Sequence, residues 1–248
     1  MVQILGIPMY DKSLSTAVCL VEKTCLSNQD RTNRLICAAS AHGLVTAQLN
    51  SELARILDAF SFILPDGMPS VWIGKLKGAK KMERCYGPDF FKEIMLSTAK
   101  APIKHFFCGG KEGVAAALKK VCENKFSNFN ITGVFSPPFR TMAEDELLAL
   151  ADQIRESDAD IVWVGMSTPK QERFAYLLSK YINVHFIITV GAAFDFFTDR
   201  ALQAPKFLQK AGLEWFFRLC TNPRRLAKRY FKIVPLFIYH NFKEWILN

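Results

Sequence analysis

The sequence has no apolar run long enough to cross a bilayer. A spanning helix needs roughly 18 to 20 such residues, and the longest candidates, Val184 to Phe194 and Ile233 to His240, are shorter. The first ten residues also lack the basic and apolar regions of a signal peptide. We therefore expect a cytoplasmic chain that meets a membrane, if at all, from its surface.

The sequence also lacks the patterns of disulfides and metal sites. Its seven cysteines are an odd number without a CxxC pair, which predicts reduced, buried thiols. Asp158-Ala159-Asp160 has the DxD spacing that can hold a divalent metal on a diphosphate. Because this pair precedes its predicted strand, it should lie at the amino edge of the sheet, away from a site. We predict no metal and no cofactor.

Acidic residues are scarce near the end of the chain. From Arg200 to Asn248 there are ten Lys and Arg but only Glu214 and Glu244 as acids, which gives +8 of the chain's +9. The first 199 residues are close to neutral. We predict a core of residues 1–199 and a basic, aromatic C-terminal appendage of residues 200–248.

Aromatic residues are interleaved with the basic ones in this appendage. Between Gly212 and Tyr230, apolar and basic residues can take opposite sides of helical pieces interrupted at Pro223, an arrangement suited to an anionic membrane. The alternatives are a helix packed on its own core with a solvated basic face, a subunit interface in a homo-oligomer, and nucleic-acid binding, for which no recognisable module is found. The candidates for membrane or acceptor contact are Arg218, Arg224, Arg225, Lys228 and Arg229.

The remaining pattern is that of an α/β protein. Half of the residues are hydrophobic and 22% are charged, as in a packed globular chain. Short apolar runs alternate with helical stretches, which predicts βα units around a mostly parallel sheet. The predicted strands are Leu35 to Ala39, Phe62 to Leu64, Ile103 to Cys108, Asn130 to Val134, Asp160 to Gly165 and Val184 to Val190. The predicted helices are Gly43 to Ala59, Asp89 to Ala99, Gly113 to Asn124, Ala143 to Ser157 and Pro169 to Lys180.

Ligands of open α/β sheets bind beyond the carboxyl ends of the strands, and four loops there carry candidate residues. They are Pro65 to Gly67, Gly109 to Gly113, Met166 to Glu172 and Gly191 to Asp195. We expect these loops to come together at one edge of the sheet.

Two of these loops have the composition of a phosphate site. Gly109 and Gly110 precede a helix, so backbone amides and the positive helix end can cradle a diphosphate, although a tight turn alone also explains the glycines. Thr168-Pro169-Lys170-Gln171 predicts a helix start, with Thr168 as N-cap and Gln171 closing a capping box. Capping does not explain Lys170, whose charge opposes the helix dipole unless it meets a phosphate.

Asp66 is the candidate general base. It follows an apolar run at the rim of the sheet, where a carboxylate can take a proton from a hydroxyl, and where capping of the turn is the structural alternative. Asp195 is the competing carboxylate, with a buried structural role as its alternative. His42 follows another predicted strand and is a further candidate, although a structural histidine is common at such a position.

Read together, these blocks resemble the WecG/TagA/CpsF family of bacterial glycosyltransferases over essentially the whole chain. The Pro169-Lys170-Gln171-Glu172 block and the block from Gly212 to Trp215 are specific. The remaining blocks are Ile4 to Pro8, Leu64 to Gly67, Glu83-Arg84, Gly87 to Asp89, Gly109-Gly110, Val164-Gly165, Val190-Gly191, Phe194-Asp195, Ala204-Pro205, Arg218-Leu219, Pro223 to Arg225 and Arg229-Tyr230.

The resemblance implies a Rossmann-like fold with helices on both faces of the sheet, and inverting, metal-independent transfer from a UDP-sugar to a saccharide on a polyprenyl diphosphate. In well-known members the sugar is N-acetylmannosamine or its uronic acid, used in wall teichoic acid or enterobacterial common antigen. Asp66 becomes the candidate base, and Arg218 and Arg225 are candidates to offset the charge of the leaving UDP. The donor-site candidates are Ser40, Gly67, Arg84, Gly87, Asp89, Gly109, Gly110, Gly165, Lys170, Gln171, Glu172, Gly191 and Asp195.

The sequence departs from the family pattern at two places. Ser40-Ala41-His42 stands where Asn-Ala-His is common, and a glycine and a basic residue are usual near Asp199 and Gln203. The donor sugar therefore stays open. We expect a peripheral enzyme at the inner face of the cell membrane. A membrane-associated protein that binds a nucleotide sugar without turning it over is the alternative.

Overall fold

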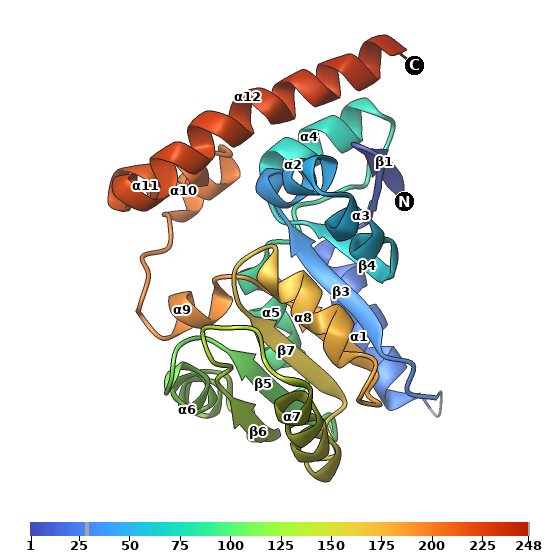
Figure 1. The fold of residues 1–248 in the computed structure, drawn as a ribbon, viewed down its shortest axis with the longest axis vertical. Coiled ribbons are helices and arrows are strands. Elements are labelled where there is room, and N and C mark those ends of the chain that lie inside the picture. Colours follow the sequence, from blue (N-terminus) through green and yellow to red (C-terminus); the bar gives the residue numbers. More distant parts are fainter. Residues whose placement is uncertain (28–29, 248) are drawn as a thin grey trace.

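The fold centres on one eight-stranded sheet. A computed structural model describes residues 1–27 and 30–247, without the side chains of Arg225, Trp245 and Leu247. The strand order of the sheet is β1-β2-β4-β3-β8-β7-β5-β6, and every pair except β1 with β2 is parallel (Figure 1). The strands are β1 (Val2–Ile4), β2 (Ile7–Met9), β3 (Arg34–Ala39), β4 (Phe60–Pro65), β5 (His105–Gly109), β6 (Ile131–Phe135), β7 (Ile161–Gly165) and β8 (Phe186–Thr189). The predicted mostly parallel α/β fold is confirmed.

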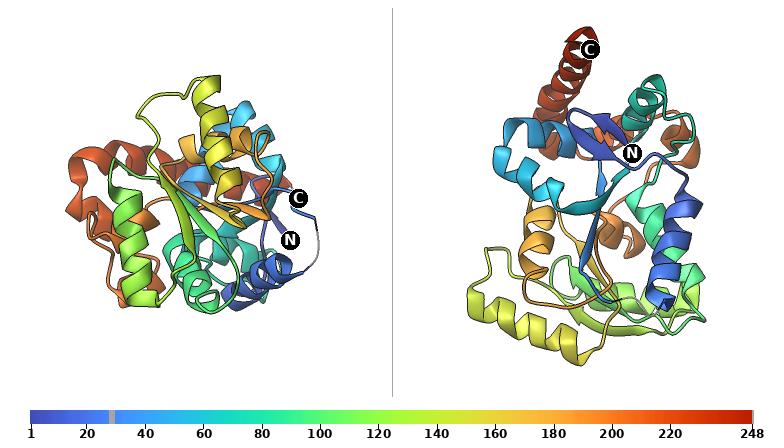
Figure 2. Two further views of the ribbon diagram at one scale, coloured as in Figure 1. Left: turned by 90° about the horizontal axis from the view of Figure 1, so that it is seen from below. Right: turned by 90° about the vertical axis from the view of Figure 1, so that its right-hand side faces the viewer.

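Helices cover both faces of this sheet and form two separate cores (Figure 2). On one face lie α2, α3, α7 and α8, and on the other lie α1, α5, α6 and α9. Successive residues of a strand point to opposite faces, so Ile36 enters one core and Cys37 the other. The helices are α1 (Leu14–Leu26), α2 (Ala41–Leu49), α3 (Ser51–Asp58), α4 (Met68–Leu76), α5 (Gly87–Ser97), α6 (Val114–Phe126), α7 (Glu144–Glu156), α8 (Lys170–Leu178) and α9 (Ala193–Phe197).

Several elements differ from the sequence prediction. The single helix predicted over Gly43 to Ala59 is two helices, because Asn50 leaves the helical conformation and its side chain caps α3 by accepting from the amide of Leu53 at 2.9 Å. The hairpin of β1 and β2, helix α1 and helix α4 were not predicted. Strands β1 and β2 have three residues each, too short to show a period.

The C-terminal appendage consists of α10 (Lys206–Lys210), α11 (Glu214–Thr221) and α12 (Pro223–Leu247). The predicted interruption at Pro223 is confirmed, since α12 begins there. Helix α12 crosses over the carboxyl end of the sheet and packs on α2 through the buried Ile233 and Phe237 (Figure 1). Within residues 1–27 and 30–247, no helix combines the length and apolar character that crossing a membrane requires. The division of the chain at residue 199 stays a prediction.

Candidate active site

The four loops that the sequence singled out come together, as predicted, at the carboxyl edge of the sheet. All four contribute to one cleft of about 2480 Å³, roofed by α11 and α12. Its middle contains Asp66, at the end of β4, and His42, at the beginning of α2. This edge is where parallel α/β sheets bind their ligands.

Asp66 is held in place by the backbone around it. Its Oδ1 accepts a hydrogen bond from the amide of Gly87 at 2.8 Å. A Cβ on Gly87 would lie only 3.0 Å from the carbonyl oxygen of Val190, so glycine permits this close approach. Burial is the largest cause of a pKa of Asp66 that is raised to about 6. The amide of Gly87 and the charges of Arg84 and Arg218 lower this pKa, and the charge of Glu214 raises it. A carboxylate with this pKa is ionised at neutral pH yet binds a proton readily, as a general base requires.

A network centred on Glu214 joins the appendage to the loop of Asp66. Glu214 is the first residue of α11, and its carboxylate pairs with the guanidinium of Arg84 and accepts a hydrogen bond from the hydroxyl of Tyr86 at 2.7 Å. Arg84 in turn donates from Nε to the backbone carbonyl of Asp66 at 2.7 Å and stacks on the ring of Tyr86. The carboxylate, the guanidinium and the hydroxyl are all largely buried, so this network fixes α11 beside the candidate base.

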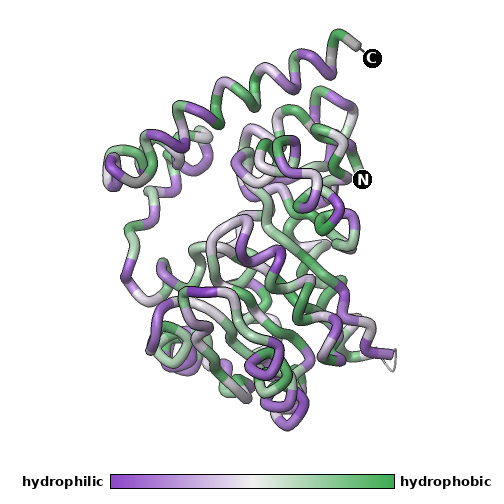
Figure 3. Tube along the Cα trace, in the orientation of Figure 1, coloured by the Kyte–Doolittle hydropathy of each residue, from purple (hydrophilic) through white to green (hydrophobic). Residues whose placement is uncertain are grey.

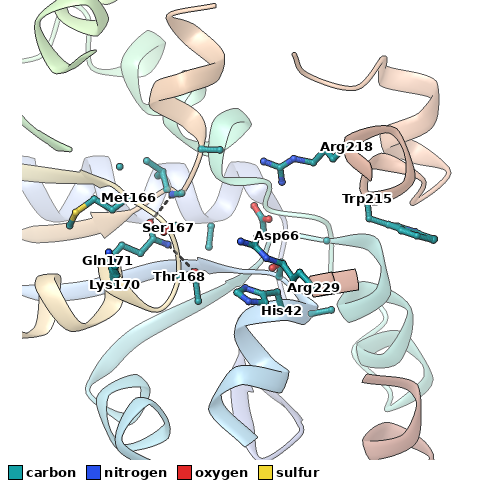
Figure 4. A pocket seen from close by; sticks show the side chains of 18 of the residues that line it. His42, Asp66, Met166, Ser167, Thr168, Lys170, Gln171, Trp215, Arg218 and Arg229 are labelled. Carbon is teal, nitrogen blue, oxygen red and sulfur yellow. Dashed lines mark hydrogen bonds between the residues drawn. The ribbon is translucent and has the colours of Figure 1, made fainter. Parts of the chain in front are cut away.

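Two arginines of the appendage face the cleft. Arg218 points toward Asp66 from α11, and Arg229 of α12 lies beside Asp66 and His42 (Figure 4). Burial, with a smaller effect from the charge of Arg229, lowers the pKa of His42 to about 4, so the imidazole is neutral at pH 7. The middle of the cleft therefore combines one base, two fixed cations and a neutral hydrogen-bonding ring.

The other predicted basic residues do not share this position. Arg224 and Lys228 are exposed and do not line the cleft. The basic and apolar residues divide only in part between opposite sides of these helices. On α12, Leu226 is buried while Arg224 and Lys228 are exposed, but Arg229 and Tyr230 both line the cleft. The side chain of Arg225 lies outside the described residues.

The glycine loop is shaped by close approach of the backbone. A Cβ on Gly109 would lie 2.5 Å from the carbonyl oxygen of Gly165, and the amide of Gly110 donates to that same oxygen at 2.9 Å. Both Gly109 and Gly110 also have positive φ angles. Gly110 and Gly165 line the cleft, whereas Gly109 is buried and does not line it.

The start of α8 differs from the predicted cap. The helix begins at Lys170, and the Thr168 hydroxyl donates to the carboxylate of Glu172 at 2.8 Å instead of accepting a backbone amide. Gln171 also departs from the capping box. Its Nε2 donates to Glu172 at 2.9 Å, and its Oε1 accepts from the amide of Gly191 at 3.0 Å. Burial raises the pKa of Glu172. These two side chains tie the loop after β7 to the loop after β8.

The remaining predicted donor-site residues are divided between the cleft and its surroundings. Ser40, Gly67, Gly191 and Asp195 line the cleft, although the backbone carbonyl of Asp195 also caps the turn after α9. Asp89 does not line it and forms an ion pair with Lys206 of α10 at 2.9 Å. Gly87 acts through its hydrogen bond to Asp66.

The two ends of the cleft have different chemistry. Over β5, β6 and β7, basic and polar side chains such as Lys111 and Lys170 line it beside the glycine loop. Lys170 lies 4.3 Å above the ring of Phe139, a side chain that is 93% exposed in the loop after β6. Between α4 and α12 the lining is mostly apolar. We call these ends the polar arm and the apolar arm.

Sequence reasoning missed three residues that this geometry brings forward, namely Tyr86, Phe139 and Glu214. Tyr86 and Glu214 lie 128 residues apart in the chain, so only the fold brings them together. Both lie within or beside blocks that carry the family resemblance, which was the available signal. No feature of the sequence distinguished Phe139 from other aromatic residues.

The DxD pair is far from this cleft, as expected. Asp158 and Asp160 precede β7 at the amino edge, where they pair with Arg31 at 2.9 and 3.1 Å. Among the described residues, no cluster of three His, Cys, Asp or Glu side chains has an arrangement suited to a metal ion.

A comparison with known protein families agrees with the site. The model of the WecG/TagA/CpsF glycosyl transferase family matches residues 2–248, nearly the whole chain. The match includes both the loops at the carboxyl edge of the sheet and the appendage above them. The chain therefore belongs to the WecG/TagA/CpsF family, whose members are glycosyltransferases of cell-surface polysaccharide biosynthesis.

Proposed function

We propose that this enzyme transfers a sugar from a UDP-sugar to a saccharide carried on a polyprenyl diphosphate, in one inverting displacement without a metal ion. The sugar is of the N-acetylmannosamine type or a related hexose or uronic acid. The observation that carries the proposal is Asp66, a carboxylate with a raised pKa, in a cleft that also contains Arg218 and Arg229.

In this mechanism the acceptor hydroxyl attacks the anomeric carbon while Asp66 removes its proton. The new bond joins the acceptor oxygen to that carbon, and the bond from the carbon to the UDP oxygen breaks. UDP leaves with the electron pair. The hydrogen bond from Gly87 fixes one carboxylate oxygen and leaves the other available for the proton.

The negative charge that develops on UDP needs to be offset by the protein. The polar arm supports this role through the side chains of Lys111 and Lys170. Arg218 is suited to the same role because a planar guanidinium group binds phosphate through two hydrogen bonds. Fixed cations of this kind stabilise a leaving diphosphate without a metal.

The appendage provides the proposed contact with the acceptor and with an anionic membrane at the inner face of the cell. Arg224 and Lys228 are exposed there, as is the aromatic side chain of Phe216. Each basic residue near such a surface contributes roughly 1 kcal/mol. Peripheral attachment would bring the cleft to the plane where a lipid-linked acceptor resides.

The proposal predicts transfer from one member of a panel of UDP-sugars to a polyprenyl-diphosphate saccharide in the presence of EDTA. The lipid product is detected by mass spectrometry, and a parallel reaction with added Mg²⁺ is the control. Equal rates with and without EDTA would support the proposal. Strict dependence on the metal would contradict its mechanism, and binding of UDP without transfer from any donor would favour a non-catalytic nucleotide-sugar-binding protein.

A further inference from the structure

Two facing rows of apolar side chains form the walls of the apolar arm. On α4, Met68, Trp72 and Leu76 recur every four residues and therefore share one side of the helix. The facing row on α12 has the same spacing and also lines the cleft. It consists of Tyr230, Val234, Ile238 and Phe242.

These rows extend from the middle of the cleft to the outside of the molecule. At the inner end, Asp66 is two residues before the start of α4, and Arg229 directly precedes Tyr230. At the outer end, Leu76 is 83% exposed and Ile238 is 63% exposed. From Tyr230 to Phe242 the helix rises by about 18 Å, at ~1.5 Å per residue. Figure 3 shows that apolar and polar residues are interleaved along this helix.

Contacts fix both helices of the groove to the rest of the protein. At the outer end, Glu244 of α12 pairs with Lys77, directly after α4, at 2.8 Å and accepts from the amide of Leu5 at 3.1 Å. In the middle of the α4 row, the ring of Trp72 lies against Gly212, in the turn between α10 and α11, where a Cβ would be only 2.6 Å from the ring. The groove is therefore preformed, as most small-molecule sites are.

We infer that this groove binds the first isoprene units of the acceptor lipid, an inference that rests on the proposed function. The inference depends on the order in which apolar, cationic and acidic side chains follow one another along the cleft. An apolar groove leads to Arg229, then to Asp66 with Arg218 beside it, and then to the polar arm. A lipid-linked acceptor has the same order, with an apolar chain, a diphosphate and a sugar hydroxyl that meets the donor.

A bilayer surface or a second copy of the chain would explain exposed apolar residues. Neither explains why these rows continue into the cleft that contains the carboxylate. Phe231 and Tyr239 are exposed apolar residues of α12 that lie outside the cleft. Variants at these positions therefore distinguish a lipid chain in the groove from a bilayer surface or a second copy on the outside of the helix.

The first test compares two acceptors with the same sugar and diphosphate, one on a long polyprenyl chain and one on a geranyl chain. Ile238→Ser and Leu76→Ser should each raise KM for the long-chain acceptor by about tenfold, which corresponds to about 1.4 kcal/mol. Their KM for the UDP-sugar and for the geranyl acceptor should change little. The matched controls are Phe231→Ser and Tyr239→Ser, which change residues 79% and 57% exposed on the same helix, and their KM values should match the native protein.

Three outcomes would overturn the inference. The first is an equal rise in KM for the control variants, which would indicate general attachment to the lipid surface. The second is a change in oligomeric state while the dependence of KM on chain length stays the same. The third is no effect of any variant on KM. If no donor supports transfer, the proposed function fails instead. Photo-crosslinking with a diazirine-bearing polyprenyl diphosphate then still tests whether the groove binds the lipid. Labelling within residues 68–76 and 230–242 would support binding in the groove, and labelling elsewhere would reject it.

Discussion

Replacing Asp66 with asparagine is expected to lower kcat for sugar transfer by about 10²- to 10⁴-fold, the usual contribution of a positioned general base. Asparagine has nearly the same size, and its oxygen can still accept the hydrogen bond that Gly87 donates at 2.8 Å. It cannot take a proton from the acceptor hydroxyl. Steady-state transfer measures the loss, and a UDP titration should show nearly native affinity.

The stability of the same variant is its control. The folded state holds the pKa of Asp66 at about 6, above the ordinary value of 3.8. Between these two values the folded protein binds more protons than the unfolded chain, so the free energy of unfolding falls as the pH rises through this range. At neutral pH the ionised carboxylate costs up to about 3 kcal/mol, at ~1.4 kcal/mol per pKa unit. Asp66→Asn should thus melt at or above the native Tm at pH 7.5. A lower Tm would attribute the lost activity to unfolding.

The native enzyme should show the titration of this base directly. Because the protonated carboxyl cannot accept the acceptor's proton, kcat/KM should fall on the acid side with an apparent pKa of about 6. An unchanged rate well below this pH would contradict the assignment of Asp66 as base.

Replacing Glu214 with glutamine is expected to lower both stability and activity. The change removes the charge that balances the largely buried Arg84 and retains a side chain of the same size. Loss of one partner of a buried pair usually costs about 3 to 5 kcal/mol. Because Glu214 fixes α11, and α11 carries Arg218, the loosened appendage should reduce kcat/KM by about 10²-fold. Thermal melts and steady-state transfer measure the two effects.

The matched control is Glu52→Gln, which breaks the exposed ion pair of Glu52 with Arg173. Exposed pairs contribute about 0 to 1 kcal/mol, so this variant should be close to native in both measurements. If Glu214→Gln behaves like this control, the network does not fix the appendage over the site.

Most of the sheet could be predicted because its central strands are buried on both faces. Each reads as a short apolar run followed by Gly, Asp or Ser, and the carboxyl edge of a parallel sheet then collects those residues. The edge hairpin of β1 and β2 and the break at Asn50 could not be predicted, since short strands show no period and the apolar pattern continues across Asn50. Helix α4 was missed although Pro69, near its start, is a helix-start signal.

The site could be predicted only in part. The position of Asp66 after an apolar run indicated a residue at the sheet edge. Which arginines of the appendage enter the cleft depends on how α11 and α12 pack, so Arg218 and Arg229 could not be separated from Arg224 by sequence. The role of Glu214 needed the fold as well, because its partner Arg84 lies 130 residues away in the chain.

The anomeric configuration of the transferred sugar tests the central claim, a single displacement with Asp66 as base, most directly. NMR of the product linkage reports this configuration, which is compared with that of the UDP-sugar. We expect inversion, because the acceptor hydroxyl attacks from the side opposite to UDP. Retention would contradict it, since a single displacement from the side opposite to UDP cannot retain the configuration of the anomeric carbon.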